Sequence, residues 1–343
     1  MNTRLCFRLA VFLTTTTFAT HNAVAFGLYN ATGLAGGSRW DATPRTMGGA
    51  ERSLSGGLRF SLQGGSFQSY RDMFSWSGGV PTVADFTAAV TNAFGNWTTV
   101  DPVSNIGTSI SFIADLATTV SSAIINNIRQ GAEIDLFAAT SAGTWGFGST
   151  GTQGETFFNS ISVPGNLTLT SGTTGYAGFA ISGADITLNS NTGALYTLTT
   201  FRNLLTHEIG HSLGLADVDL QSGPGGTFID DNYNATSSAT ALATLTNSFI
   251  GLINPLNPSA SPLNLYTVAN GNPGVDTPGV DILMESAIPN ALFFGNGVPL
   301  QNDDYAGRQF MYPKVVPEPS AALVFMAGAA MLGMRRQRGS RVV

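Results

Sequence analysis

The sequence predicts an α+β fold, in which a few helices pack against a β-sheet. Short runs that alternate apolar and polar residues, such as 58–62, predict strands, whereas residues 83–100 and 201–213 place apolar side chains at helical spacing. No charged or proline-rich linker divides residues 26–314. We therefore expect one large domain between two short terminal segments.

The composition excludes several classes of protein. Only 10% of the 343 residues are charged, against a typical share of about 25%, and 43% are hydrophobic, which argues against a disordered polymer. The single lysine, Lys314, leaves no basic surface for nucleic acid. The single cysteine, Cys6, lies near the N-terminus, so residues 26–314 have neither a disulfide nor a thiolate metal site.

Residues 1–25 have the pattern of a secretory signal peptide. Arg4 and Arg8 precede the apolar run 9–18, and the small-x-small sequence at 23–25 is a typical cleavage site. We expect the chain to be exported.

The body begins with short strands and continues with alternating helices and strands. Residues 26–80 contain several alternating runs, and Asp85 lies in the first turn of the helix expected over 83–100. Further strands are expected at 110–113, 133–138 and 185–188.

A helix with metal-ligand spacing follows, with the sequence FRNLLTHEIGHSLGLAD. His207 and His211 are four residues apart, so both imidazoles project from one side of the helix and can bind one zinc ion. Glu208 follows the first histidine, where its carboxylate can reach water at the ion without being a ligand. These are the only two histidines of the body, which makes a chance match improbable.

The chain then provides a turn and a third ligand. Gly214 tolerates a left-handed conformation and can end the helix. Asp217, three residues further, can complete the ligand set with a carboxylate oxygen, and Asp219 is an alternative.

The pattern HExxHxxGxxD resembles the metzincin metallopeptidases, specifically a matrixin-like branch. The resemblance implies a twisted mixed β-sheet with an active-site helix and a C-terminal helix. It also implies one catalytic Zn²⁺ held by His207, His211 and Asp217, with Glu208 as the general base for peptide hydrolysis. Family members usually have a third histidine where Asp217 stands.

Three segments outside the HExxHxxGxxD pattern extend the resemblance, two after it and one before it. Met284 lies in a sequence similar to the family's methionine turn, which supports the zinc site from beneath. Gly214, at the end of the helix, is a second structural support. Residues 300–313 resemble the last helix, in which Asp303 and Asp304 would brace that turn. Residues 183–186 resemble the edge strand along which substrate lies.

The long segment 218–280 departs from the family and is expected to be an insert. It either shapes one side of the cleft or only decorates it. Asp219, Asp230 and Asp231 lie in or near glycine-containing loops, so Ca²⁺ is a second candidate ion, with simply solvated carboxylates as the alternative.

Residues 316–343 resemble a PEP-CTERM sorting tail of Gram-negative bacteria. The sequence Val-Pro-Glu-Pro at 316–319 precedes an apolar run, 321–334, and then an arginine-rich end. The resemblance implies an exosortase-type sorting enzyme as partner, transient association with the inner membrane, and a final location at the cell surface or outside the cell. A plain membrane anchor is the alternative.

Together these patterns predict a secreted zinc endopeptidase that acts on a protein or peptide substrate. The alternative is a surface adhesin or matrix protein on the same fold, with a zinc site that is not catalytic. A third hypothesis takes Glu285 as a distant third ligand, and Gly214 argues against it.

Overall fold

The computed structural model describes the parts of the chain that surround the predicted metal site. The described residues are 27–28, 38–47, 49–100, 107–121, 131–140, 153–162, 179–217, 283–288, 290–297 and 299–312. The predicted signal peptide, the insert up to residue 280 and the predicted sorting tail lie outside them. Within the described residues, no helix has the length and apolar character needed to cross a membrane.

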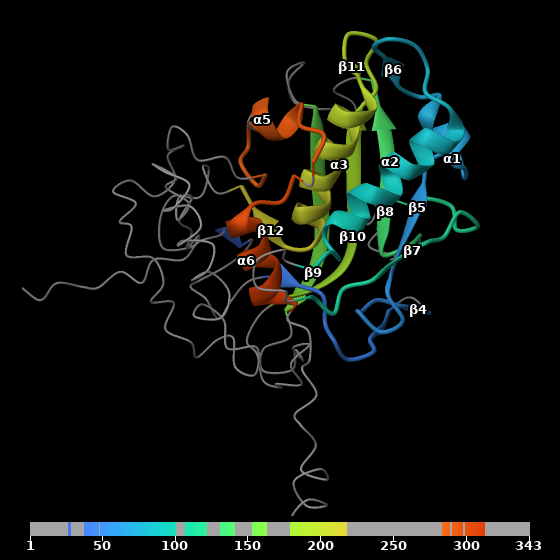
Figure 1. Cartoon of the computed structure of the whole chain (residues 1–343). Coiled ribbons are helices and arrows are strands. Elements are labelled where there is room, and N and C mark those ends of the chain that lie inside the picture. The colour runs from blue at the N-terminus through green and yellow to red at the C-terminus, as the bar shows by residue number, and fades with distance from the viewer. Residues whose placement is uncertain are drawn as a thin grey trace, which may run out of the picture.

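A six-stranded, mostly parallel sheet forms the centre of the fold (Figure 1). Strand β10 pairs in parallel with β8 and β2, β8 with β5, and β5 with β7, whereas β9 runs antiparallel to β10. The strands are β2 (Ser38–Arg39), β5 (Leu58–Leu62), β7 (Phe112–Ala114), β8 (Ile134–Ala139), β9 (Gly154–Ser162) and β10 (Phe179–Asn189). This mixed α/β arrangement is compatible with the predicted α+β class.

Three two-stranded pairs accompany the sheet. They are β1 (Gly27–Leu28) with β12 (Leu215–Ala216), β6 (Ser75–Trp76) with β11 (Leu195–Tyr196), and β3 (Thr46–Met47) with β4 (Ala50–Glu51). The β6–β11 pair is parallel, and the other two pairs are antiparallel.

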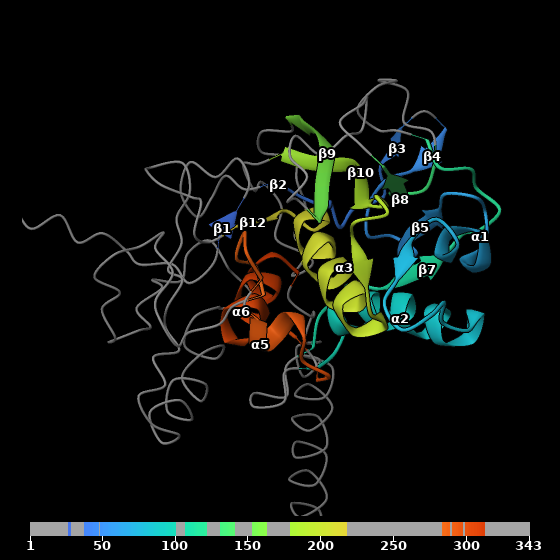
Figure 2. The same ribbon diagram turned by 90° about the horizontal axis from the view of Figure 1, so that it is seen from above.

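The helices gather on one face of the sheet (Figure 2). Helices α2 and α3 lie side by side, with α5 and α6 on the other side of α3. The helices are α1 (Phe67–Arg71), α2 (Val83–Asn96), α3 (Leu198–Ser212), α5 (Asn290–Phe293) and α6 (Asn302–Met311).

The two long helices begin at threonine caps. The hydroxyl of Thr82 accepts a hydrogen bond from the backbone N–H of Asp85, and that of Thr197 accepts one from Thr200. Each cap satisfies an N–H group that has no partner within the helix. Both helices therefore start where the sequence places a short hydroxyl side chain before an apolar run.

The core lies between the sheet and the two long helices. Alternate residues of β5, including Phe60, are buried against α2, where Phe60 stacks on Phe94 with ring centroids 4.0 Å apart. Ile134 and Leu136 of β8 continue this apolar layer. Burial of one face thus follows from the alternation in the strands and from the helical spacing in α2.

The opposite face of the sheet carries buried polar side chains. Asp135 of β8 lies between Ser61 of β5 and Asp185 of β10 in the strand register. Its carboxyl accepts hydrogen bonds from the Ser61 hydroxyl and from the backbone N–H groups of Ser121 and Ala132. Burial outweighs these hydrogen bonds and raises the pKa of Asp135 to about 7.

The helices predicted over 83–100 and 300–313 are confirmed as α2 and α6, and the strand at 58–62 as β5. The prediction that residues 183–186 form the edge strand is wrong. These residues lie inside β10, which pairs with both β8 and β9, and β9 is the antiparallel strand on the outside. Strand order depends on long-range pairing, which the local pattern does not contain.

The raised pKa of Asp135 predicts a pH-dependent stability. From pH 4 to 7 the unfolded carboxyl is ionised while the folded one keeps its proton, so the free energy of unfolding should fall as the pH rises. The slope from this one group is up to about 1.4 kcal/mol per pH unit. Asp135→Asn should remove that contribution, which urea unfolding at pH 4, 5, 6 and 7 would measure. Equal slopes for both proteins would contradict the prediction.

Candidate metal centre

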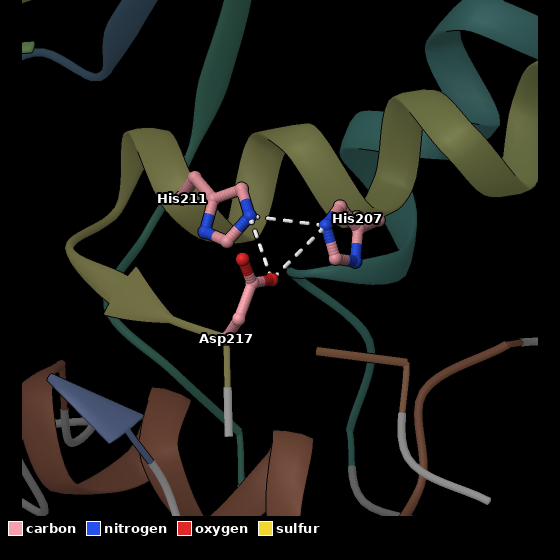
Figure 3. Close-up of side chains that lie close together, drawn as sticks. All are labelled: His207, His211 and Asp217. Carbon is pink, nitrogen blue, oxygen red and sulfur yellow. Dashed lines mark hydrogen bonds and ion pairs between the residues drawn. The ribbon is translucent and has the colours of Figure 1, made fainter. Parts of the chain in front are cut away.

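Helix α3 and the chain that follows it bring three potential metal ligands together (Figure 3). The Nε2 atoms of His207 and His211 are 3.0 Å apart, and Oδ1 of Asp217 lies 3.5 Å from the first and 3.2 Å from the second. Within the described residues, these three are the one group of histidine, cysteine and acidic side chains close enough to share an ion. The predicted ligands therefore do come together.

Backbone carbonyls fix the orientation of both imidazoles. Nδ1 of His207 donates to the carbonyl of Leu283 at 2.7 Å, and Nδ1 of His211 donates to that of Leu215 at 2.9 Å. In a neutral imidazole with its proton on Nδ1, Nε2 carries a lone pair. Both lone pairs therefore face the same point beside Asp217. This arrangement of ligand and outer partner is typical of histidines that bind metals.

The geometry fits a small tetrahedral cation. Ligand atoms at about 2.0–2.1 Å from a tetrahedral zinc are about 3.3 Å from one another, and the three distances here are 3.0, 3.2 and 3.5 Å. Oδ1 of Asp217 is also buried, and its polar neighbours are the two imidazole nitrogens. A buried carboxylate oxygen is costly unless a positive charge compensates it.

The charges of the three groups are coupled. Burial lowers the pKa of His207, and the neighbouring His211 lowers it further. Burial acts in the same direction on His211, but Asp217 outweighs it and raises the pKa of His211 to about 9. The pKa of Asp217 is lowered, because the histidines outweigh the effect of burial. The site thus favours a positive charge between the imidazoles and the carboxylate, either a proton or a metal ion.

Gly214 makes the turn that carries Asp217 back to the histidines. Its φ is +99°, and a Cβ at this position would lie 2.1 Å from the carbonyl oxygen of Ser38. Both the left-handed backbone and the close contact require glycine. The chain then pairs with β1 through β12 and reaches Asp217 directly after this strand.

Met284 supports the helix between the two histidines. It is buried, and a Cβ on Gly210 of α3 would lie 2.3 Å from the Met284 sulfur, so the thioether packs directly on the helix backbone. The preceding Leu283 provides the carbonyl that holds His207. The Met284 segment therefore both packs beneath the pair and orients one ligand.

Asp304 of α6 holds the Met284 segment in place. One carboxylate oxygen accepts hydrogen bonds from the N–H groups of Leu283, at 3.1 Å, and Gln301, at 2.7 Å, and the other accepts from Met284 at 3.2 Å. Burial outweighs these three hydrogen bonds and raises the pKa of Asp304 to about 7. The bracing role expected of Asp304 is confirmed, whereas the side chain of Asp303 lies outside the described part of the chain.

Three aromatic side chains that the sequence pattern did not connect to the site bind backbone carbonyls of α3 and its C-cap. The indole N–H of Trp40 donates to the carbonyl of Ser212, and the hydroxyl of Tyr312 donates to that of Leu213. Trp97 donates to the carbonyl of Thr206, directly before His207. Each of these residues lies at least 99 positions along the chain from its partner, so only the tertiary structure connects it to α3.

Glu208 lies beside the ligand group and is not part of it. Its carboxylate is buried and accepts a hydrogen bond from the hydroxyl of Thr156 at 2.7 Å. Thr156 could not be predicted from the sequence, because a threonine in a strand carries no signal of such a contact.

The other candidate ligands do not join this group. Glu285 is described and buried, and it is not one of the three clustered ligands. The described residues do not include Asp219, the alternative third ligand, or Asp230 and Asp231, the further candidates for Ca²⁺. The choice between Asp217 and Asp219 remains a prediction in favour of Asp217.

Removal of the carboxylate ligand should weaken metal binding. The wild-type chain is expected to bind one Zn²⁺, and Asp217→Ala should lower its affinity by about 100-fold or more, because loss of an outer partner alone costs about 10–100-fold. Competition with a chromophoric zinc chelator would measure both affinities. Asp72→Ala, which removes an exposed carboxylate paired with Arg71, is the matched control and should bind as the wild type does. Equal affinities for all three proteins would exclude Asp217 as a ligand.

Substitution of Asp304 should weaken zinc binding, although Asp304 is not one of the three candidate ligands. Asp304→Asn keeps the size of the side chain but turns an NH₂ group towards a backbone N–H, whichever way the amide points, because both oxygens accept such bonds. The Leu283 carbonyl should then hold His207 less well, and zinc affinity should fall about 10-fold. The same competition assay measures this change, with circular dichroism as the check that the fold persists. An unchanged affinity in a folded protein would contradict the bracing argument.

No protein-family model and no curated protein matches this chain. The case for a metal centre therefore rests on the positions of His207, His211 and Asp217 and on the partners that orient them.

Proposed function

We propose that this protein is a zinc-dependent endopeptidase of the matrixin-like metzincin type, exported from the cell. The observation that carries the proposal is the position of Glu208. Its carboxylate lies beside the group formed by His207, His211 and Asp217 but is not one of the ligands. A purely structural metal site needs no buried carboxylate in that place.

The donor set supports zinc as the metal. Two imidazole nitrogens and one carboxylate oxygen are ligands that Zn²⁺ accepts, and their separations suit a tetrahedral ion. Three protein ligands leave one position open, which is typical of catalytic sites, whereas structural zinc sites usually have four. The methionine beneath the histidines and the buried Asp304 are further features that the resemblance to metzincins leads us to expect.

The positions of the side chains suggest a role for each residue in the reaction. Bound zinc would supply Lewis-acid chemistry, polarising the scissile carbonyl and making water more acidic. His207, His211 and Asp217 would hold the ion. Glu208 would take a proton from the attacking water and pass it to the nitrogen of the leaving amine. Bond cleavage then consumes one water and leaves Glu208 as it began.

Strand β9 is well placed for an extended substrate. It is paired only with β10 among the described strands, which makes it the outer strand of the described sheet. A peptide can bind by adding to such an edge. Because Thr156 of β9 contacts Glu208, a peptide on this edge would pass close to the proposed base.

We propose that the terminal segments direct the protein to its place of action. Residues 1–25 would export the chain, and residues 316–343 would associate transiently with the inner membrane until an exosortase-type enzyme processes them. The sequence patterns at both ends support this route to the cell surface or beyond.

Substitution of Glu208 separates metal binding from catalysis. Glu208→Ala should keep zinc affinity within about 3-fold and lower the rate of peptide cleavage by about 100-fold to 10,000-fold, the range for loss of a general base. His207→Ala should lose both zinc and activity. The measurement is cleavage of a library of denatured-protein peptides, with bound zinc determined on the same samples.

Two outcomes would overturn the proposal. A Glu208→Ala variant with full activity would exclude this residue as the base. A folded, zinc-loaded wild type that cleaves no peptide would favour the alternative, a surface or matrix protein in which the zinc site only stabilises the fold.

A further inference from the structure

The Glu208 carboxylate is held against strand β9 by one hydroxyl group. Oγ1 of Thr156 lies 2.7 Å from Oε2 of Glu208 and 3.1 Å from the Glu208 backbone carbonyl oxygen. The hydroxyl has one proton, and a carboxylate accepts a stronger hydrogen bond than a neutral carbonyl does. Thr156 therefore donates to Oε2.

The same strand makes room for the carboxylate at Gly154. Residues 154 and 156 lie on the same side of β9, because side chains alternate along a strand. A Cβ at Gly154 would lie 2.4 Å from Oε1 of Glu208 and 2.9 Å from its Cδ. Any side chain at 154 would thus have to displace the carboxylate.

The two carboxylate oxygens of Glu208 have different surroundings. Oε2 accepts from Thr156, whereas Oε1 accepts from no donor in the described part of the chain. Glu208 is only 3% exposed, so water does not orient the group from all sides. Within the described residues the carboxylate is consequently hydrogen-bonded at Oε2 and not at Oε1.

We propose that Thr156 is a positioning residue that binds Oε2 of Glu208 and so reserves Oε1 for proton transfer. The inference rests on the proposed peptidase function. Oε1 takes the proton of the attacking water, and the same oxygen delivers it to the nitrogen of the leaving amine. Thr156 keeps its own proton throughout, so its contribution is the fixed orientation of the base.

This arrangement joins the base to the strand that we propose for substrate binding. Glu208 belongs to α3, whereas Thr156 belongs to β9, and their hydrogen bond spans the helix and the sheet edge. A peptide that adds to β9 and the carboxylate that acts on it are then positioned by one strand. Correct orientation of a catalytic group can account for large rate factors.

The test compares Thr156→Val, Thr156→Ser and the wild type, each loaded with zinc. Valine has the shape of threonine without the hydroxyl, so Thr156→Val should lower kcat for peptide cleavage about 10-fold to 100-fold, with KM within about 2-fold and zinc content unchanged. Thr156→Ser retains the donor and should recover most of kcat. Thr187→Val on the neighbouring strand β10 is the matched control, because Thr187 is buried and lies on the opposite face of the sheet. It should keep the wild-type kcat.

A double-mutant cycle with Glu208→Ala adds a measurement that does not depend on activity. Once the carboxylate is absent, Thr156→Val should lower Tm less than it does in the wild type, and it should not reduce the residual cleavage rate further. Additive changes in Tm would contradict the contact itself.

The outcomes distinguish this inference from the proposed function. An active wild type with an equally active Thr156→Val variant would overturn the role of Thr156 and leave the peptidase function standing. A Thr156→Ser variant as impaired as Thr156→Val would also overturn it, because shape and not the hydroxyl would then matter. A folded, zinc-loaded wild type that does not cleave peptides would overturn both.

Discussion

The candidate centre depends on two hydrogen bonds that turn both imidazoles towards one point. The carbonyls of Leu283 and Leu215 each accept from an Nδ1–H, which leaves two Nε2 lone pairs 3.0 Å apart. Two lone pairs at that distance repel each other unless a positive charge lies between them. The nearby carboxylate of Asp217 completes a pocket for a cation, and much of the surrounding structure serves to keep this arrangement in place.

The supports of the site come from distant parts of the chain. Asp304 on α6 fixes the backbone that holds His207, and Trp40 and Tyr312 bind the last carbonyls of α3. These contacts are buried, where a hydrogen bond is worth more and a missing partner costs more than in water. The geometry of the ligands is therefore maintained by the packing of the whole helical layer on the sheet.

Strand β9 is the strand of the sheet that contacts Glu208. It is the antiparallel strand on the outside of an otherwise parallel sheet. It contacts Glu208 through Thr156, and the absence of a side chain at Gly154 lets the carboxylate pack against the strand. Glu208 thus connects α3, which carries both histidines of the candidate centre, with the outer strand of the described sheet.

The sequence by itself determined the parts of the site that depend on local periodicity. The spacing of His207 and His211, the position of Glu208 after the first ligand, and the glycine that reverses the chain before Asp217 all lie within one helix and its turn. Their relative positions follow from the geometry of the helix and from the left-handed conformation that Gly214 allows. The resemblance also pointed to Met284 and Asp304. Met284 packs on the backbone of α3, and Asp304 binds the backbone of the Met284 segment.

Only the tertiary structure decided which distant groups complete the site. It showed that β9, and not residues 183–186, is the outer strand, and that Thr156, Trp40 and Tyr312 bind α3 and Glu208. Strand order and backbone hydrogen-bond partners depend on contacts between residues far apart in the chain. A pattern that repeats every two or four residues records which side of an element is buried, but it does not record what lies against that side.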